Sequence, residues 1–256
     1  MLPLSRQNAY RDRYQKRHPD WRAGSAEFEA LVRRRLRPES RVLDVGCGRG
    51  GVMELFWREV SLPVGVDPDR ASLREHRTRS SLPAGERSGV RANSMPLACA
   101  LAERLPFENA AFDVALALWV LEHLPEPRQA LLEVARVLKP GGGFLFLTPN
   151  ALHPLIVVNR GSQLLPAVQR ALVPRLYGRA EADTFRVHYR ANTPDKLRAL
   201  AAACGFRVVS LRAIHDPSYL AFNDFFFELS VLLESVLPRG WGVHLVGEWV
   251  KVARPT

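Results

Sequence analysis

The sequence predicts an α/β protein in which a mainly parallel sheet is covered by helices on both faces. A short apolar strand over 41–45 runs directly into a glycine-rich turn at 46–51 and a helix-like segment at 52–57. The segment 112–118 is almost entirely apolar, as expected of a central parallel strand that is buried on both faces. Further strand-like runs alternate with helical patterns, an order typical of parallel sheets.

The length and composition are those of one globular domain with an elaboration. A chain of 256 residues can bury a sizeable core, and its three scattered cysteines form no C-x-x-C pair. Pro3, Ser5 and Arg6 interrupt the first apolar residues, so we expect no signal peptide. No uninterrupted apolar run reaches the roughly 18 residues of a membrane-spanning helix. We expect a cytoplasmic protein without a disulfide framework or a zinc site.

The positive charge is concentrated near the start of the chain. The formal net charge is +10, and residues 1–41 contain eleven lysines and arginines against five acidic residues. Such a segment could bind nucleic acid phosphates or an anionic membrane surface. An ordinary solvated surface rich in arginine explains the same pattern, and both interpretations stay open.

Periodicity and turn residues predict the remaining elements. Ser25 with Glu27 suggests a capped start for the first helix, and Thr193 with Pro194 indicates the start of another. Residues 78–95 read as an exposed loop. Helices are expected over 25–36, 128–138 and 194–204, and strands over 62–67, 95–101, 143–148, 206–211 and 243–253.

The helix expected over 220–237 is unusually apolar. Its ordinary explanation is packing on the sheet, but an apolar acceptor, a dimer face or an interfacial membrane contact would suit it too. Asp224, Glu228 and Ser235 lie together on its other side. The apolar stripe consists of Phe222, Phe225, Phe226, Leu229, Leu233, Val236 and Leu237.

The glycine turn is typical of a nucleotide-binding corner, because glycine permits close backbone approaches and a helix start offers free N–H groups. Gly46, Gly48 and Gly51 also satisfy the G-x-G-x-x-G dinucleotide fingerprint, so spacing alone is ambiguous. Asp44 precedes the first glycine by two residues. Asp67 ends the second strand, where a carboxylate can accept hydrogen bonds from ribose hydroxyls.

Downstream motifs favour one reading of this corner. They are Leu105-Pro106-Phe107, Phe112-Asp113, Leu121-Glu122-His123 and the run from Leu138 to Gly142. From Val42 to Asn150 the chain resembles the class I S-adenosylmethionine-dependent methyltransferases of the small-molecule type, similar to ubiquinone-type, Methyltransferase-11-like enzymes. The resemblance implies a Rossmann-like seven-stranded sheet, mostly parallel with the last strand antiparallel, and S-adenosylmethionine as the cofactor.

The resemblance implies cofactor contacts along the carboxyl ends of the strands. Leu101 departs from the family pattern, which usually has an aspartate there for the adenine amino group, so backbone N–H groups at Ala102 or Glu103 would meet the ring instead. A backbone carbonyl near Leu118 would face the cofactor's amino group, while Trp119 is either core or a wall beside the methyl group. The predicted cofactor residues are Asp44, Gly46, Cys47, Gly48, Gly50, Asp67, Leu101, Ala102, Leu118 and Trp119.

The candidate general bases are His123, His153 and His188. Because the sulfonium is an activated donor, catalysis chiefly positions the acceptor, and a base is needed only for a hydroxyl of high pKa. In ubiquinone-type enzymes a Leu-Glu-His segment with another nearby acid can bind a divalent metal. Trp119 stands where that acid would be, so we expect no metal here.

Four regions are expected along the chain. They are a basic arm and helix over 1–40, a cofactor-binding core over 41–150, a helical lid over 151–190 that binds the acceptor, and the rest of the same domain over 191–256. For the basic arm, the resemblance implies that Arg13 or Tyr14 touches the cofactor's carboxylate, and a mobile arm is the alternative.

The expected function is methyl transfer to a small-molecule or lipid-like acceptor, at oxygen. The alternatives are an RNA (tRNA) methyltransferase that uses the basic arm and a non-catalytic cofactor-binding protein. Peripheral membrane contact stays open as a partner interaction.

Overall fold

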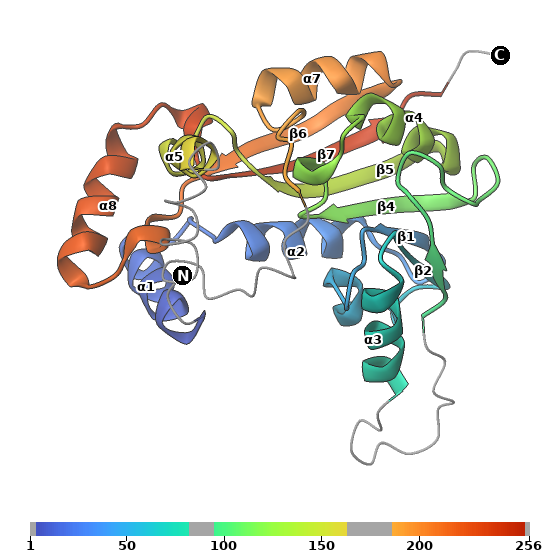
Figure 1. Cartoon of the computed structure of the whole chain (residues 1–256), viewed down its shortest axis with the longest axis horizontal. Coiled ribbons are helices and arrows are strands. Elements are labelled where there is room, and N and C mark those ends of the chain that lie inside the picture. Colours follow the sequence, from blue (N-terminus) through green and yellow to red (C-terminus); the bar gives the residue numbers. More distant parts are fainter. Residues whose placement is uncertain (1–3, 82–94, 163–185, 254–256) are drawn as a thin grey trace.

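The computed structural model describes residues 4–81, 95–162 and 186–253 (Figure 1). Within these residues seven strands form one sheet in the order β3-β2-β1-β4-β5-β7-β6. β7 runs antiparallel to both of its neighbours, β5 and β6, and the other strands are parallel to one another. The strands are β1 (Arg41–Val45), β2 (Leu62–Asp67), β3 (Leu97–Cys99), β4 (Phe112–Leu118), β5 (Leu138–Pro149), β6 (Phe206–Ile214) and β7 (His244–Lys251). The predicted fold class is confirmed.

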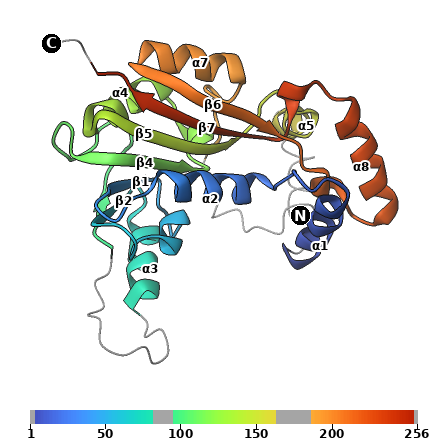
Figure 2. The ribbon, with the colours of Figure 1, turned by 180° about the vertical axis from the view of Figure 1, so that it is seen from behind.

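Helices cover both faces of this sheet (Figures 1 and 2). On one face lie α4 (Pro127–Val137) and α7 (Pro194–Ala203), and a core there joins Leu131 and Leu197 to Phe144, Phe146 and Trp249. On the other face lie α2 (Gly24–Arg35), the short 3-10 helix η1 (Val52–Leu55) and α3 (Arg70–Ser81). Their core contains Phe28, Val32, Met53, Leu116 and Leu145.

A third group of helices lies beyond the carboxyl ends of β5 and β6 (Figure 1). Here α1 packs on α8 and η4, and the ring of Tyr10 stacks on that of Phe227 with centroids 4.8 Å apart. The predicted basic arm is therefore an ordered helix through Arg17. The group comprises α1 (Leu4–Arg17), α5 (Pro154–Ser162), η4 (Pro217–Leu220), α8 (Asp224–Val236) and η5 (Arg239–Trp241).

The apolar helix expected over 220–237 does not pack on the sheet, so that prediction is wrong. The helix begins only at Asp224, because the side chain of Asn223 caps it by accepting the Phe226 N–H. Its predicted inner stripe is exposed, whereas Phe227 and Ser230 are buried against neighbouring elements.

Other element boundaries differ locally from the prediction. Thr193 caps α7 as expected by accepting the Lys196 N–H, but α2 has Ala23 at its N-cap and no side-chain cap from Ser25. β5 begins at Leu138 rather than at Gly143, since Leu138 already pairs with Phe112. Part of the predicted 78–95 loop lies in α3, and residues 82–94 are outside the described residues.

The predicted lid over 151–190 can be assessed only at its two ends. Its first part is helical in α5, and residues 163–185 lie outside the described residues. In the part of the chain that is described, no helix is both long enough and apolar enough to cross a membrane.

Candidate cofactor and acceptor site

The glycine turn closes over the carboxyl ends of β1 and β2. Gly46, Gly48 and Gly50 have φ angles of 73°, 50° and 122°, values that side chains strongly disfavour. The N–H groups of Gly46 and Cys47 both donate to the Val66 carbonyl, at 2.8 and 3.0 Å. The turn is thereby held against the end of β2, and the buried Cys47 thiol has its pKa raised by burial.

Asp67 lies directly beneath this turn. Its Oδ2 accepts the Gly48 N–H at 2.9 Å, and its Oδ1 accepts the Asp69 N–H at 2.8 Å. Burial raises the pKa of this carboxyl although both hydrogen bonds oppose the shift. Each carboxylate oxygen has a second lone pair, so the geometry leaves capacity for the two ribose hydroxyls that the sequence predicts.

Asp44 is the less satisfied of the two acids. It is 2% exposed, and its Oδ2 has no hydrogen-bond partner among the described residues. Burial and the neighbouring Asp67 raise the pKa of Asp44 to about 7. A Cβ at Gly51 would lie 3.2 Å from this oxygen, so the turn approaches it closely.

These two acids fit S-adenosylmethionine. Two neighbouring carboxyls, each with a pKa raised by burial, favour a cationic ligand, which restores the charged form of the acid. The cofactor carries a sulfonium, an ammonium and a ribose diol, so its charges and its hydroxyls match Asp44 and Asp67.

The end of β4 adjoins the same turn. Val120 stands where a Cβ at Gly46 would be, so the glycine allows the two segments to touch. Trp119 has a φ of 59°, a strained value for a bulky residue, and its N–H donates to the Leu147 carbonyl at 2.9 Å. Its half-buried ring meets that of His244 edge-on at 4.9 Å. Trp119 also packs against the core on the α2 side of the sheet, so a position beside the methyl group stays a prediction.

The predicted adenine end lies along the same edge. The Ala100 N–H donates to the Asp67 carbonyl at 3.3 Å, which places the segment after β3 beside the predicted ribose ligand. Leu101 is exposed and Ala102 is half-buried. The fold therefore brings the ten predicted cofactor residues to the carboxyl ends of β1 to β4, and their contacts with the cofactor stay predictions.

Glu122 is a further buried acid, just beyond the end of β4. It lies in the short helix η2 (Leu121–His123), where burial raises its pKa to about 7. The Thr148 hydroxyl donates to Glu122 Oε2 at 2.9 Å, and Asn192 Nδ2 donates to the Thr148 oxygen at 2.5 Å. The Glu122 carbonyl accepts the N–H of His188 at 2.7 Å, so this predicted histidine is brought to the same place.

His123 follows Glu122 directly, and a backbone carbonyl orients its ring. Its Nδ1 lies 3.1 Å from the Arg186 carbonyl, which can only accept, so Nδ1 carries the proton and the lone pair is on Nε2. Burial lowers the pKa of His123, which favours the neutral ring. Nε2 lies 4.0 Å from Glu122 Oε1. The described residues hold no group of three or more metal-ligating side chains, and the absence of a metal stays a prediction.

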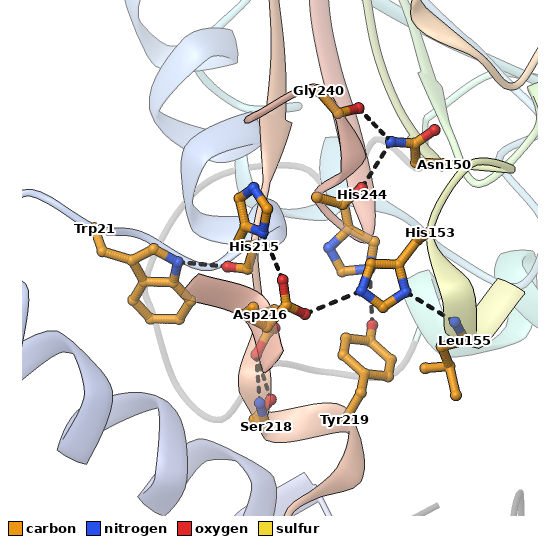
Figure 3. Close-up of polar contacts among 12 residues, drawn as sticks. Trp21, Asn150, His153, Leu155, His215, Asp216, Ser218, Tyr219, Gly240 and His244 are labelled. Carbon is orange, nitrogen blue, oxygen red and sulfur yellow. Dashed lines mark hydrogen bonds and ion pairs between the residues drawn. The ribbon is translucent and has the colours of Figure 1, made fainter. Parts of the chain in front are cut away.

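His153 belongs to a separate polar cluster, shown in Figure 3. Its Nδ1 accepts the Leu155 N–H at 3.2 Å, and its Nε2 lies 3.0 Å from Glu234 Oε1. His215 Nδ1 lies 2.5 Å from the other oxygen of Glu234. His153 would have to break one of these hydrogen bonds to take a proton, so its role as a base stays a prediction without local support.

This cluster includes groups that sequence reasoning missed. Hydrogen bonding to Glu234 raises the pKa of His215. Burial would raise the pKa of Glu234, but the hydrogen bonds from His153 and His215 outweigh burial and lower it. His244, fully buried with its pKa lowered to about 3 by burial, lies 2.9 Å from the Tyr219 hydroxyl. The only sequence signals were a histidine directly after β6 and one that begins β7.

The basic first helix faces acids of its own chain. Arg11 binds Asp216 at 2.8 Å, and both Arg13 and Arg17 bind Glu228, at 2.6 and 2.8 Å. These partners place Arg13 against α8, and Tyr14 packs on Trp21. Half of the expected charge excess near the start of the chain is thus engaged within the protein, which weakens the case for an RNA-binding arm.

Comparison with known proteins agrees with this geometry. The methyltransferase domain family matches residues 43–146. A ubiquinone biosynthesis O-methyltransferase of Hahella chejuensis is 36% identical over 123 residues, 48% of this chain and 49% of that protein. One of Maricaulis maris is 36% identical over 210 residues, 80% of this chain and 68% of that protein. The first match thus spans about half the length of that relative, and the second spans two thirds.

A solved structure shows the same fold. The geranyl diphosphate C-methyltransferase of Streptomyces coelicolor superposes with a TM-score of 0.60 at 15% identity, covering 89% of this chain and 77% of that one. That protein was solved with Mg²⁺, geranyl diphosphate and S-adenosyl-L-homocysteine. The extended match to the Maricaulis maris protein agrees with the strand order and with the glycine turn over two buried acids. The chain therefore belongs to the class I S-adenosylmethionine-dependent methyltransferases.

Proposed function

We propose that this protein transfers the methyl group of S-adenosylmethionine to a hydroxyl oxygen of a small, lipid-like acceptor. The observation that carries the proposal is the pair of buried acids, Asp44 and Asp67, under the glycine turn. The names of the Hahella chejuensis and Maricaulis maris relatives, both ubiquinone biosynthesis O-methyltransferases, support oxygen as the methylated atom.

The chain's own residues divide the work between binding and proton removal. The cofactor supplies a methyl group already activated on a sulfonium. Asp67 would hold the ribose hydroxyls, and Asp44 would balance the positive charge of the cofactor at the glycine turn. Trp119 and Val120 form an apolar wall that keeps water from the acceptor.

His123 is the proposed base. Its lone pair lies on Nε2 because the Arg186 carbonyl orients Nδ1, and its lowered pKa keeps the ring neutral at physiological pH. The nearby Glu122, with a pKa near 7, would stabilise the imidazolium that forms as the hydroxyl loses its proton. His153 is the weaker candidate, because its Nδ1 accepts the Leu155 N–H and its Nε2 lies within hydrogen-bond distance of Glu234.

The test is transfer of labelled methyl from S-adenosylmethionine into an extract of the source cells, followed by phase partition. Counts in the organic phase would support a lipid-like acceptor. Counts in acid-precipitable, nuclease-sensitive material would mean RNA and would contradict the proposal.

A variant pair then tests the base. His123→Gln should lower kcat roughly hundredfold or more with little change in cofactor affinity, the size expected for loss of a general base. The matched control is His18→Gln, an exposed histidine directly after α1, which should keep full activity. Equal activity of both variants would remove His123 from the mechanism.

A further inference from the structure

The helix α8 has three distinct faces, which follow from its sequence at 100° per residue. One face, with Phe227, Ser230 and Glu234, is directed into the molecule. A second face carries Asp224 and Glu228, both bound by arginines of α1. The third face is wholly apolar and consists of Phe225, Phe226, Leu229, Leu232, Leu233 and Val236.

This third face is open to solvent. Phe225 is 71% exposed, Leu232 62% and Val236 73%. Isolated exposed apolar side chains are ordinary, but a contiguous stripe along a 13-residue helix marks an interaction surface. Figures 1 and 2 place α8 at the outer end of the molecule, beyond the sheet.

Further exposed apolar side chains lie near the stripe. The residue before α5, His153, pairs with Glu234 of α8, and α5 itself exposes Val157 and Val158 at this end of the molecule. Trp241, just past α8, is 38% exposed. Tryptophan is typical of the boundary between apolar and polar layers of a bilayer.

The charges around the stripe are complementary to an anionic surface. Arg13 and Arg17 neutralise the acidic face of α8, so this face adds little repulsion. Arg239 follows the helix directly and is exposed, and Arg6 and Lys16 are exposed on the adjoining α1. The whole chain has a formal net charge of +10.

We propose that α8 docks this protein on an anionic phospholipid surface, with its apolar face in the acyl boundary and the nearby cations at the headgroups. A helix of 13 residues is about 20 Å long, which suits a position in the plane of the interface. A second copy of the chain would fit this face less well, because two copies would place their exposed cations beside each other and repel. The inference goes beyond methyl transfer, since docking requires neither cofactor nor acceptor.

The test is co-sedimentation of the full chain, without cofactor, with vesicles of 70% phosphatidylcholine and 30% phosphatidylglycerol. The wild type should bind these vesicles, and binding should fall on pure phosphatidylcholine or at high salt. Phe225→Ser with Leu232→Ser should lower the partition coefficient at least about tenfold, because two side chains lose their burial in the acyl layer.

The control double variant is Leu55→Ser with Val209→Ser, which removes exposed apolar side chains elsewhere and should bind like the wild type. Thermal melts must show that both double variants stay folded. The proposal is overturned if the wild type binds neither vesicle, or if the α8 variant binds as well as the control. A concentration-dependent dimer that the α8 variant abolishes would assign the face to a second copy instead. These readouts do not involve methyl transfer, so their failure leaves the proposed function untouched.

Discussion

The two ends of the sheet's carboxyl edge are built in different ways: the cofactor edge lies at β1 to β4, and the helices beyond β5 and β6 form the far end. At the cofactor edge, neighbouring stretches of chain make the site: Gly48 and Asp67 are 19 residues apart and are joined by one hydrogen bond. At the far end, the partners are distant in sequence. Tyr10 donates to Asp224 across 214 residues, and Arg11 binds Asp216 across 205.

The two regions differ in whether their buried polar groups have partners within the protein. The cofactor edge holds unsatisfied or strained features, namely the orphaned Asp44 oxygen, the left-handed glycines and the φ of Trp119. The far end pairs its buried charges, as in Glu234 with its two histidines. We infer that the cofactor edge sacrifices local stability for ligand binding, whereas the far end anchors α1, α5 and α8 to the sheet.

The largest expected effect is at the cofactor edge. Asp67→Ala should weaken S-adenosylmethionine binding roughly hundredfold to thousandfold, because two hydrogen bonds to a charged group are lost. Calorimetric titration measures the change. The control is Asp113→Asn, a carboxyl at the opposite end of the strands that accepts the Arg41 N–H and binds Lys139. Unchanged affinity in Asp67→Ala would refute the ribose assignment.

The next effect is at the far end. Glu234→Gln should lower the free energy of unfolding by about 3 kcal/mol near pH 6, because a buried carboxylate loses its charge between two histidines. The raised pKa of His215 means that its part of this stabilisation is full below pH 6.5 and is lost as pH rises through the folded pKa. The lowered pKa of Glu234 means that its part is present above pH 4.5 and is lost on acidification.

Urea unfolding at several pH values measures this change. The wild type should therefore exceed the variant most between about pH 4.5 and 6.5. A difference that grows steadily above pH 7 would contradict the ion-pair account. Cofactor affinity should be almost unaffected by Glu234→Gln, which distinguishes the two ends.

An effect of opposite sign, no larger than that of Glu234→Gln, is expected at Glu122, between the two ends. Its pKa of about 7 exceeds the unfolded value of 4.5, so the folded state binds the additional proton, and wild-type stability should fall as pH rises through this window. Glu122→Gln keeps an acceptor for Thr148 and cannot ionise. Relative to the wild type it should gain up to about 3 kcal/mol of stability above pH 7. Parallel pH profiles of the two proteins would show that Glu122 is charged at neutral pH.

The smallest effect is expected on the exposed side of α8. Glu228→Gln removes the partner of Arg13 and Arg17, but its side chain is 44% exposed and solvent screens the pair. The shift in a thermal melt should be close to experimental error. A loss as large as that of Glu234→Gln would mean that the α1–α8 contact depends on surface charge rather than on Tyr10 and Phe227.

The strands and the glycine turn of the cofactor edge could be predicted from the sequence, because local patterns determine them. The spacing from Asp44 to Gly51 and the acid at the end of β2 follow from backbone chemistry within short segments, and the predicted strands lie close to the observed ones. The position of α8 could not be predicted in this way. Its apolar periodicity is the same for a helix packed on the sheet and for one facing solvent, and only the Tyr10, Arg13 and Asn223 contacts decide between them.

The polar group around Glu122 was recognisable only in part. Glu122 and His123 were recognisable from the Leu-Glu-His motif, but Thr148 and Asn192 join them only through the pairing of β4 with β5 and the approach of the segment before α7. The pairing of Glu234 with His215 could not be predicted from the sequence, because the two residues lie on different elements. The part of the predicted lid over 163–185 is outside the described residues.

The most direct test of the central claim is the pH dependence of S-adenosylmethionine affinity in the wild type and in Asp44→Asn. A cationic ligand stabilises the ionised form of Asp44, whose pKa is about 7 without ligand. Binding should therefore release a proton, and wild-type affinity should rise roughly tenfold from about pH 6 to about pH 8. Asp44→Asn should bind more weakly and without this rise. A wild-type affinity that stays level across this range would contradict the role of the buried acid pair.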